Sequence, residues 1–305
     1  MERISFWRSS WLLIISRKEA LGLWIWCSLV ASLIVGRGFP PISTTLMSIT
    51  AFFFIAIAVY GYNDVVDMDA DKNNTSKQDR PLSSGLVSRG DAMKLVYIAS
   101  IIGLSISFLN NLPSFLFSLL YFVLFWLYSY PKIHLKKRFL VKEFVISCGI
   151  LLIGLSVCYA ILGVFSPMVF VGFSMFSIFA FFSMPTGFDS TDVEADKLQG
   201  VKTIASIMNL KRRLQLAITG MLIIMTITPF TYINFGYNML LPILIMFGGL
   251  VFLRNLVPLM MSLSPTVNTL EMSVIMRSRR TILTFIFVLS IFLVIGSINL
   301  SGYIG

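Results

Sequence analysis

Acidic residues gather directly after a long apolar run, and their spacing is the first sign of chemistry in this sequence. The stretch YGYNDVVDMDAD occupies residues 60–71. If the helix predicted for the apolar run continues through it, Asn63, Asp67 and Asp71 fall within about 80° of arc, whereas Asp69 points elsewhere. Like charges on one helix face repel each other unless a cation lies among them. The spacing therefore predicts a bound cation.

A second acidic cluster repeats the pattern. The stretch GFDSTDVEADK, residues 187–197, also follows an apolar run. On a continuing helix, Asp189, Asp192 and Asp196 share one face and Glu194 points away. The two clusters are offset by a constant number of residues, and each ends in Asp-Lys. They have the form of two copies of one arrangement; the simpler alternative is a pair of solvated helix ends.

The residue types favour a hard divalent metal as the cation. Mg²⁺ prefers oxygen ligands and is commonly held by one or two carboxylates together with substrate phosphates. Zinc requires His or Cys, and the single histidine, His134, lies in the basic run PKIHLKKR. Neither cluster has the glycine at the sixth position that a calcium EF-hand loop needs. The sequence therefore predicts Mg²⁺ as the cofactor.

The composition places these clusters in a membrane protein. The chain has 305 residues, of which 57% are hydrophobic and 12% charged, against about 45–50% and about 25% in soluble domains. No removable signal peptide is expected, because no charged start followed by a short apolar core and a cleavage site opens the chain. The cysteines lie inside apolar runs, which predicts buried thiols and neither a disulfide framework nor a metal site.

Runs of about 20 mainly apolar residues are long enough to cross a bilayer as helices. The sequence therefore predicts an all-α polytopic membrane bundle of about nine transmembrane helices. The expected spans are residues 20–36, 41–62, 92–110, 113–130, 143–163, 165–187, 214–233, 238–260 and 281–300.

Basic residues predict the orientation of these spans. All but one of the 24 Lys and Arg residues lie at the N-terminus or beside the connections that follow the second, fourth, sixth and eighth spans, and the exception is Arg37. The positive-inside rule then gives a cytoplasmic N-terminus, both acidic clusters on the cytoplasmic side, and an external C-terminus. The membrane is the plasma membrane if the source is prokaryotic. The net charge of +10 is then mostly orientation charge, that is, Lys and Arg residues that set the orientation of the spans in the membrane. No nucleic-acid partner is needed to explain it.

Four motifs resemble those of the UbiA-type intramembrane prenyltransferases. NDVVDMDAD is similar to the family's N-D-x-x-D-x-x-x-D signature, and DSTDVEADKLQGVKT to its second Asp-rich motif. QDRPLSSG, residues 78–85, and YSYPKIHLKK, residues 128–137, resemble the segments after the second and fourth spans. Members often carry Lys and Gly where this chain has Phe188 and Ala195. The four motifs occur in the family's order.

The resemblance implies a single membrane domain over residues 1–305, with Asp-rich halves at about 1–140 and 141–305, helices around a central cavity, and a defined reaction. An isoprenyl group passes from a Mg²⁺-bound prenyl diphosphate to a lipophilic or aromatic acceptor within the membrane, and diphosphate is released. The expected partners are this donor, the acceptor and membrane lipid. The acceptor's identity and the donor's chain length leave no motif in the sequence.

The resemblance and the charge pattern together assign roles to residues. The expected metal ligands are Asn63, Asp67, Asp71, Asp189, Asp192 and Asp196. The catalytic group comprises Asp67, Asp71, Asp192, Asp196 and Tyr128. The expected diphosphate-binding residues are Asn63, Arg80, Lys132, Arg17, Lys72 and Lys197; for the basic ones, orientation charge is the alternative.

Further expectations concern neighbouring segments. Tyr128 lies one helical turn before Lys132, so that both are expected to face one site, with the tyrosine ring stabilising an allylic cation. Residues 72–90 are expected to cover the site and exclude water, or else to form a disordered connection. Residues 264–280 are expected to form an amphipathic segment without chemistry.

Other functions stay open at the level of sequence. A transporter would place its acids near mid-span, whereas these lie at span ends. Another intramembrane transferase with Asp-rich helix ends, such as an alcohol phosphatidyltransferase, would carry an Asp-Gly and Ala-Arg signature that is missing here. A lipid-binding structural protein is the remaining alternative.

Overall fold

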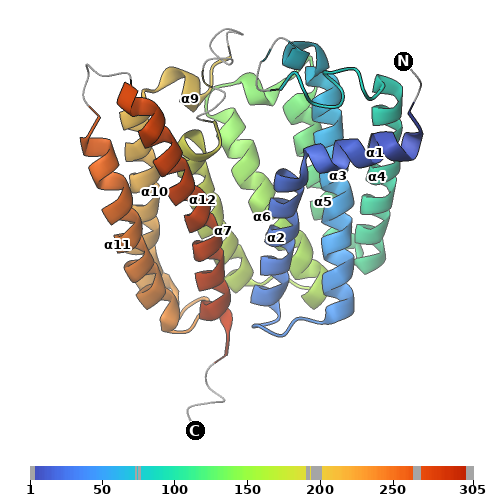
Figure 1. Cartoon of the computed structure of the whole chain (residues 1–305). Helices are drawn as coiled ribbons and strands as arrows, with labels where there is room; N and C mark the ends of the chain where they lie inside the picture. Colours follow the sequence, from blue (N-terminus) through green and yellow to red (C-terminus); the bar gives the residue numbers. More distant parts are fainter. Residues whose placement is uncertain are drawn as a thin grey trace. The chain divides into compact units, whose positions relative to one another are not determined.

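The structure is a computed structural model that describes residues 4–72, 74, 77–189, 193, 201–263 and 269–299. Within these ranges the regular elements are helices, and no strand occurs (Figure 1). Their bounds are α1 Phe6–Ser16, α2 Lys18–Val35, α3 Ile42–Lys72, α4 Arg89–Asn110, α5 Leu112–Ser129, the 3₁₀ turn η1 Leu135–Lys137, α6 Val141–Leu162, α7 Pro167–Gly187, α9 Ile204–Ile207, α10 Leu210–Thr231, α11 Leu240–Met261 and α12 Thr269–Ser297.

Nine of these helices, counted over the described residues, are long and apolar enough to cross a membrane. They are α2 to α7, apart from η1, and α10 to α12, and they confirm the predicted all-α fold and the nine spans. The short helix α1 was not predicted. Residues 269–280 form the start of the continuous helix α12, and the amphipathic character expected for this segment stays a prediction. Residues 264–268 lie outside the described ranges.

The chain divides into two compact units. The first unit comprises Met1–Ser32, Pro41–Leu135 and Leu152–Phe165, and the second comprises Leu33–Pro40, Lys136–Leu151 and Ser166–Gly305. Each acidic cluster belongs to a different unit. A single domain with two consecutive halves stays a prediction, and each unit is described by itself.

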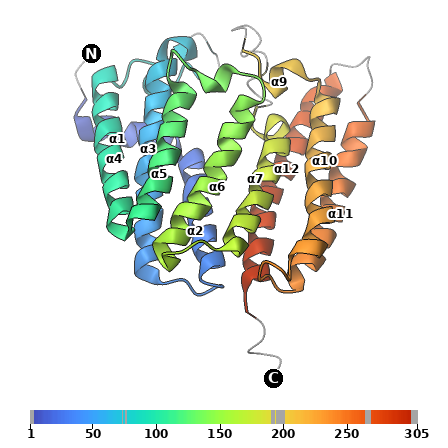
Figure 2. The ribbon, with the colours of Figure 1, turned by 180° about the vertical axis from the view of Figure 1, so that it is seen from behind.

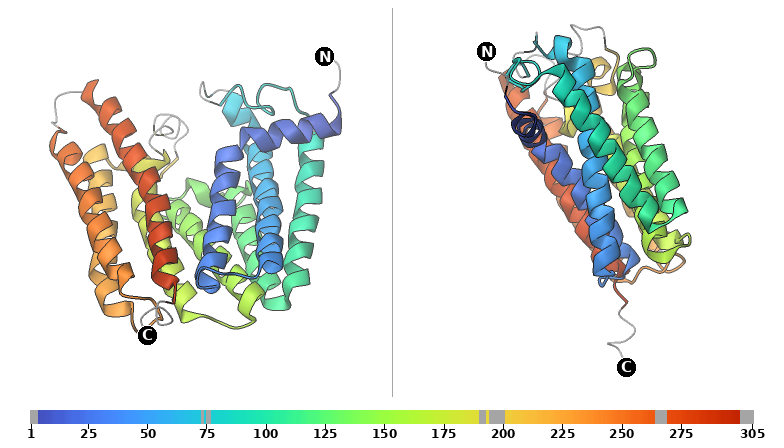
Figure 3. Two further views of the ribbon diagram at one scale, coloured as in Figure 1. Left: turned by 60° about the horizontal axis from the view of Figure 1, so that its bottom comes forward. Right: turned by 90° about the vertical axis from the view of Figure 1, so that its right-hand side faces the viewer.

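In the first unit, α3 packs against α4 and α5, which also pack against each other (Figure 2). The close approach of α3 and α4 depends on Gly103, where a Cβ would lie 2.8 Å from the carbonyl oxygen of Ala51. Aromatic rings fill the core: the Tyr121 ring centroid lies 5.6 Å from those of both Phe52 and Trp24. Helix α1 crosses α3 and α4 short of their ends (Figure 3), and Leu13 of α1 belongs to one apolar cluster with Val65 of α3 and Ala92 of α4. These contacts fix the end of α3, which carries the first acidic cluster.

In the second unit, α7 packs against α10 and α12, and α11 packs against α10 and α12. Phe179, Phe252 and Phe285 form its aromatic centre, with ring centroids 4.9 to 5.7 Å apart. Tyr237, in the link before α11, donates to the carbonyl oxygen of Met168 at 2.9 Å. Burial raises the pKa of this tyrosine, so that it stays a neutral donor. The packing positions the end of α7, next to the second cluster.

Candidate active site

The first acidic cluster lies on an unbroken helix, as the sequence predicted. Helix α3 continues to Lys72, well beyond the predicted end of the span. Asn63 and Asp67 are half-buried and Asp71 is buried, whereas the Asp69 side chain is 81% exposed and accepts a hydrogen bond from Lys72 Nζ at 2.8 Å. Asp69 therefore points away from the shared face, and Lys72 lies beside it.

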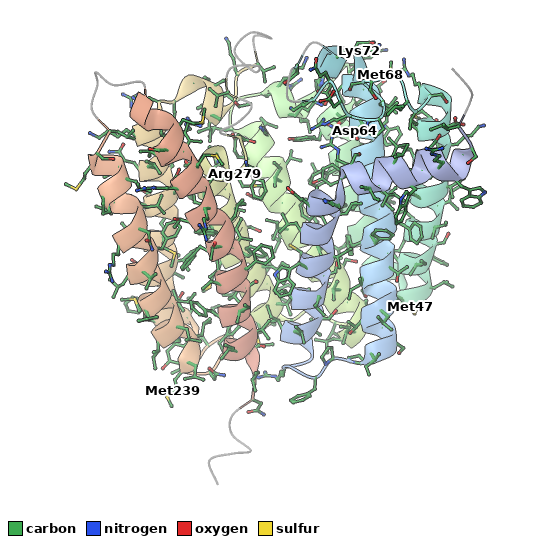
Figure 4. All side chains as sticks on the ribbon, in the orientation of Figure 1. Met47, Asp64, Met68, Lys72, Met239 and Arg279 are labelled. Carbon is green, nitrogen blue, oxygen red and sulfur yellow. The ribbon has the colours of Figure 1, made fainter. Side chains whose placement is uncertain are left out.

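Asp64 is a carboxylate of this cluster that lies beside two arginines, and it was not among the predicted site residues. Its side chain is only 7% exposed. Arg17 Nε donates to Asp64 Oδ2 at 3.0 Å, and Arg17 Nη2 donates to Asp64 Oδ1. Such paired contacts are the strongest geometry between a guanidinium and a carboxylate. Figure 4 shows Asp64 near the end of α3, with Met68 and Lys72 on the following turns.

The position of Asp64 was available from the sequence. Residues seven apart on a helix differ by only about 20° in direction, so Asp64 lies on nearly the same face as Asp71. The prediction used only the four-residue spacing that links Asn63, Asp67 and Asp71. Asp64 lies three residues before Asp67 and seven before Asp71, and both spacings also place side chains on nearly the same side of a helix.

Arg17 lies at the junction of α1 and α2. Burial lowers the pKa of its guanidinium, but the Asp64 carboxylate more than compensates, so that this pKa is raised above its usual value. The guanidinium carbon also lies 5.6 Å from the centre of the Tyr60 ring, within the range of a cation–π contact. Tyr60 is in turn fixed by Trp24, whose Nε1 donates to the tyrosine hydroxyl at 2.8 Å. Arg17 is therefore a positioned cation.

Arg80 is a second cation at the same carboxylates. Its Nη1 donates to Asp71 Oδ2 at 2.7 Å and lies 3.7 Å from Asp64 Oδ1. It belongs to the stretch predicted to cover the site. In the described part of that stretch, Leu82 and Val87 are buried, at 2% exposed each, in an apolar cluster with residues of α1, α3 and α4. This part is folded onto the helices, which contradicts the alternative of a disordered connection there.

Helix α5 supports the cluster from the other side. Ser129 Oγ donates to Asn63 Oδ1 at 2.9 Å, which fixes the first residue of the motif. The half-buried Tyr128 packs against Phe125, with ring centroids 5.9 Å apart. The helical turn assumed between Tyr128 and Lys132 does not form, because α5 ends at Ser129 and a turn follows. That both side chains face one site stays a prediction. Lys132 is exposed.

At the second cluster, the assumption of a continuous helix is also wrong. Helix α7 ends at Gly187, before the first acid. Pro185 lacks a backbone N–H and glycine is a poor helix former, so that the helix weakens here. Arg213 is buried and its Nη1 donates to the Pro185 carbonyl oxygen at 3.1 Å, which satisfies one of the carbonyls left at a helix end.

Asp189 is buried at 8% exposed. Its Oδ1 lies 2.7 Å from Lys142 Nζ, whereas its buried Oδ2 has no hydrogen-bond partner among the described residues. The predicted ligands Asp192 and Asp196, the predicted diphosphate contact Lys197, and the off-face Glu194 all lie outside the described ranges. Their common face with Asp189 stays a prediction.

Two residues at the start of α6 were missed as members of this site. Lys142 was counted only as orientation charge, although it is the cation beside Asp189. Glu143 is fully buried, and its Oε1 accepts from the Ile204 backbone N–H at 3.3 Å. It thereby fixes the segment that follows the second Asp-rich motif. A buried acid at a membrane edge often marks a functional site. Its partner, the backbone N–H of Ile204, lies 61 residues further along the chain, so that local sequence did not predict the contact.

The donor set fits a hard metal ion. Among the described residues, no three His, Cys, Asp or Glu side chains are grouped as a metal site. Mg²⁺ needs fewer protein ligands than that, because one or two carboxylates and substrate phosphates suffice. In the first unit, the aligned oxygens on α3 meet this requirement. In the second unit, the buried Oδ2 of Asp189 has no partner among the described residues and is available as a ligand atom. The first cluster combines carboxylates with fixed guanidinium groups at the end of a membrane helix.

Such a chain is an integral membrane protein that carries carboxylates and guanidinium groups together at the end of a membrane helix. A model of the UbiA prenyltransferase family matches residues 24–260, which is most of the chain. The protein belongs to the UbiA prenyltransferase family and is a prenyltransferase. This confirms the resemblance found in the sequence and excludes the transporter and the purely structural protein as its class.

Relatives and solved structures agree with this assignment. The chain is 31% identical over 202 residues to the digeranylgeranylglyceryl phosphate synthase of Sulfurisphaera tokodaii, covering 65% of this chain and 69% of that protein. It is 32% identical over 215 residues to the Sulfolobus acidocaldarius protein of the same name, covering 66% and 74%.

Two solved structures share the fold at lower identity. One, from work on digeranylgeranylglyceryl phosphate synthase in membranes, has a TM-score of 0.74 at 19% identity and covers 97% of this chain and 99% of its own. The other is a UbiA homologue from Archaeoglobus fulgidus bound to GPP and Mg²⁺, with a TM-score of 0.64 at 18% identity, covering 88% and 98%.

Proposed function

We propose that this protein transfers an isoprenyl group from a prenyl diphosphate to a lipophilic acceptor, and that the transfer requires Mg²⁺. The observation that carries the proposal is the end of α3. There, Asp64 and Asp71 contact the guanidinium groups of Arg17 and Arg80. Carboxylates for metal and guanidinium groups for phosphate oxygens are the two components that diphosphate binding needs.

The two acidic clusters have matched roles in this proposal. The residues that would hold the metal are Asn63, Asp67, Asp71, Asp189, Asp192 and Asp196. Mg²⁺, when bound, neutralises charge on the leaving diphosphate oxygens. The unpartnered Oδ2 of Asp189 supports a cation at the second cluster.

The basic residues complete the binding of the diphosphate. Arg17 and Arg80 are fixed at the α3 carboxylates and present N–H donors there. We also assign diphosphate contacts to Lys132, Lys72 and Lys197. Of these, Lys72 contributes least, because it lies beside the exposed Asp69. Lys142 is added to the set, since it is the cation at Asp189.

In the reaction, the bond between the allylic carbon and the diphosphate oxygen breaks, and the electron pair leaves with the diphosphate. The allylic carbon then forms a bond with a nucleophilic atom of the acceptor, which gives up its proton. Developing charge on the leaving oxygens is stabilised by donors that are already in position. The Tyr128 ring is proposed to stabilise the cation.

The relatives favour one acceptor class. By their names they make a glyceryl phosphate that carries two geranylgeranyl groups. We propose the same product here, with a geranylgeranyl group transferred to the free hydroxyl oxygen of geranylgeranylglyceryl phosphate. The hydroxyl proton leaves, a carbon–oxygen ether bond forms, and diphosphate is released.

The purified protein in nanodiscs tests this directly. With Mg²⁺, geranylgeranyl diphosphate and geranylgeranylglyceryl phosphate, we expect the ether product and diphosphate in equal amounts by mass spectrometry. Parallel reactions with aromatic acceptors serve as the comparison. Product only with an aromatic acceptor would overturn the acceptor assignment and leave prenyl transfer intact.

Metal removal has a separate expected result. Binding of geranylgeranyl diphosphate should weaken by at least about tenfold in EDTA, because the metal that would offset the negative charge of the diphosphate is then missing. Isothermal titration with and without Mg²⁺ measures this difference, and restored affinity on adding excess Mg²⁺ is the control. Equal affinity in both conditions would contradict the role proposed for the carboxylates.

The proposed orientation puts the N-terminus and both clusters on the cytoplasmic side and the C-terminus outside. The distribution of basic residues supports it. A reporter that is active only in the cytoplasm should therefore be silent when fused after Gly305 and active when fused at the N-terminus. A strong signal from the C-terminal fusion would contradict the orientation.

A further inference from the structure

A groove in the second unit lies between α11 and α12, away from both acidic clusters in sequence. Its volume is about 630 Å³, within the range of about 300–1,000 Å³ found for ligand sites. Every residue that lines it belongs to these two helices. None of the residues proposed for the transfer reaction lines the groove.

The groove is cationic toward one end and aromatic toward the other. Arg254, Arg277 and Arg280 line it, as do Phe247 and Phe292. With a rise of about 1.5 Å per residue, Phe247 lies about 10 Å along α11 from Arg254, and Phe292 lies about 18 Å along α12 from Arg280. Because α11 and α12 are antiparallel neighbours, the arginines share one end. Figure 4 agrees, with Arg279 toward one end of α12 and Met239 at the opposite end of α11.

The three arginines have exposed side chains, and none forms an ion pair with another described residue. The groove lining contains no acidic side chain among the described residues. Charged residues within membrane spans are costly and mark functional sites. Three guanidinium groups in one apolar groove repel each other, and a bound anion would offset this repulsion. A guanidinium binds phosphate oxygens through paired donors.

We propose that this groove is a binding site for an anionic membrane phospholipid. The phosphate of the lipid contacts Arg254, Arg277 and Arg280, and an apolar chain follows Phe285 toward Phe247. Phe285 is 5% exposed and Phe247 is 67% exposed. The apolar chain of the lipid would therefore contact the packed core at Phe285 and the protein surface at Phe247. The charge and the apolar wall match the two parts of a lipid.

Native mass spectrometry with phosphatidylglycerol as the probe tests the site in the full-length protein. Arg254→Gln combined with Arg280→Gln should weaken lipid retention by about tenfold, because charge-assisted hydrogen bonds are lost. The matched control is Arg212→Gln, an exposed arginine at the start of α10 that is remote from the groove in sequence. It should retain lipid as the wild type does.

A second variant distinguishes binding in the groove from a general electrostatic attraction between arginines and lipid headgroups. Val251 lines the groove and is 42% exposed, so Val251→Trp fills the groove while every charge stays. It should also reduce lipid retention. Retention that falls only with the arginine changes would overturn the proposal and leave surface electrostatics as the cause. Displacement of the lipid by geranylgeranyl diphosphate without Mg²⁺ would overturn the assigned ligand.

The wild-type protein provides a test that does not depend on the folding of variants. A photoreactive phosphatidylglycerol, cross-linked in nanodiscs and mapped by peptide mass spectrometry, should label residues 247–259 and 277–292. Labelling spread evenly over the other spans would contradict a discrete site.

Discussion

Replacing Asp67 by asparagine should abolish prenyl transfer and leave the fold intact. Asp67 lies on the face of α3 that carries Asp64 and Asp71, and the change removes one proposed metal ligand while keeping the shape of the side chain. We expect a loss of about 10²–10³-fold or more in the rate, the scale seen when one stabilising group is removed from a charged transition state. Product formation at saturating Mg²⁺, donor and acceptor measures it.

Asp69→Asn is the matched control for this change. It removes the same charge from the same helix two residues away, but Asp69 is exposed and paired with Lys72. Its rate should stay near that of the wild type, and the thermal midpoints of both variants without Mg²⁺ should match. If Asp69→Asn loses as much activity as Asp67→Asn, the α3 face is not the site. Asp192→Asn applies the same test to the second cluster.

Breaking the contact between Arg17 and Asp64 should strongly destabilise the protein. Both side chains are largely buried, at 17% and 7% exposed, so removal of one leaves the other charged without its main partner. Loss of one member of a buried pair costs about 3–5 kcal/mol. We expect large drops in thermal midpoint for Arg17→Gln and for Asp64→Asn, and a double variant that loses less than the two changes added together.

The double-mutant cycle separates this pair from a general loss of charge. Lys72→Gln with Asp69→Asn is the reference cycle, because that pair is also formed within the first unit but is exposed. Its thermal midpoints should barely change. Additive effects at Arg17 and Asp64 would show that the two side chains are not energetically coupled.

The spans and the first cluster were predictable because local sequence determines them. Apolar length gave the nine helices, and the periodicity of α3 placed Asp69 off the face that Asp67 shares. Helix α1 was missed because it is too short to cross a membrane and carries both polar and apolar residues. The predicted span 165–187 ends where α7 ends. Only the continuation of the helix into the acids fails, because the effect of Pro185 and Gly187 outweighs the regular spacing of the acids.

The contacts that were missed join residues far apart in the chain. Arg17 was expected to contact only a diphosphate, and its partner Asp64 lies on another helix. Lys142 and Asp189 are likewise brought together by tertiary packing. A single sequence shows which residues are charged, but which charges meet depends on how the helices pack, and spacing along one helix carries no information on that.

The guanidinium groups of Arg17 and Arg80 already neutralise the carboxylates at the end of α3. These ion pairs bear on whether the chain must bind metal before it can fold. A newly inserted chain that brought several carboxylates together without a cation would depend on metal to fold, as small zinc domains do. Here the chain's own arginines take the place of the metal during assembly. We therefore expect the first unit to fold before it meets Mg²⁺ or donor, and to stay folded when the metal is removed.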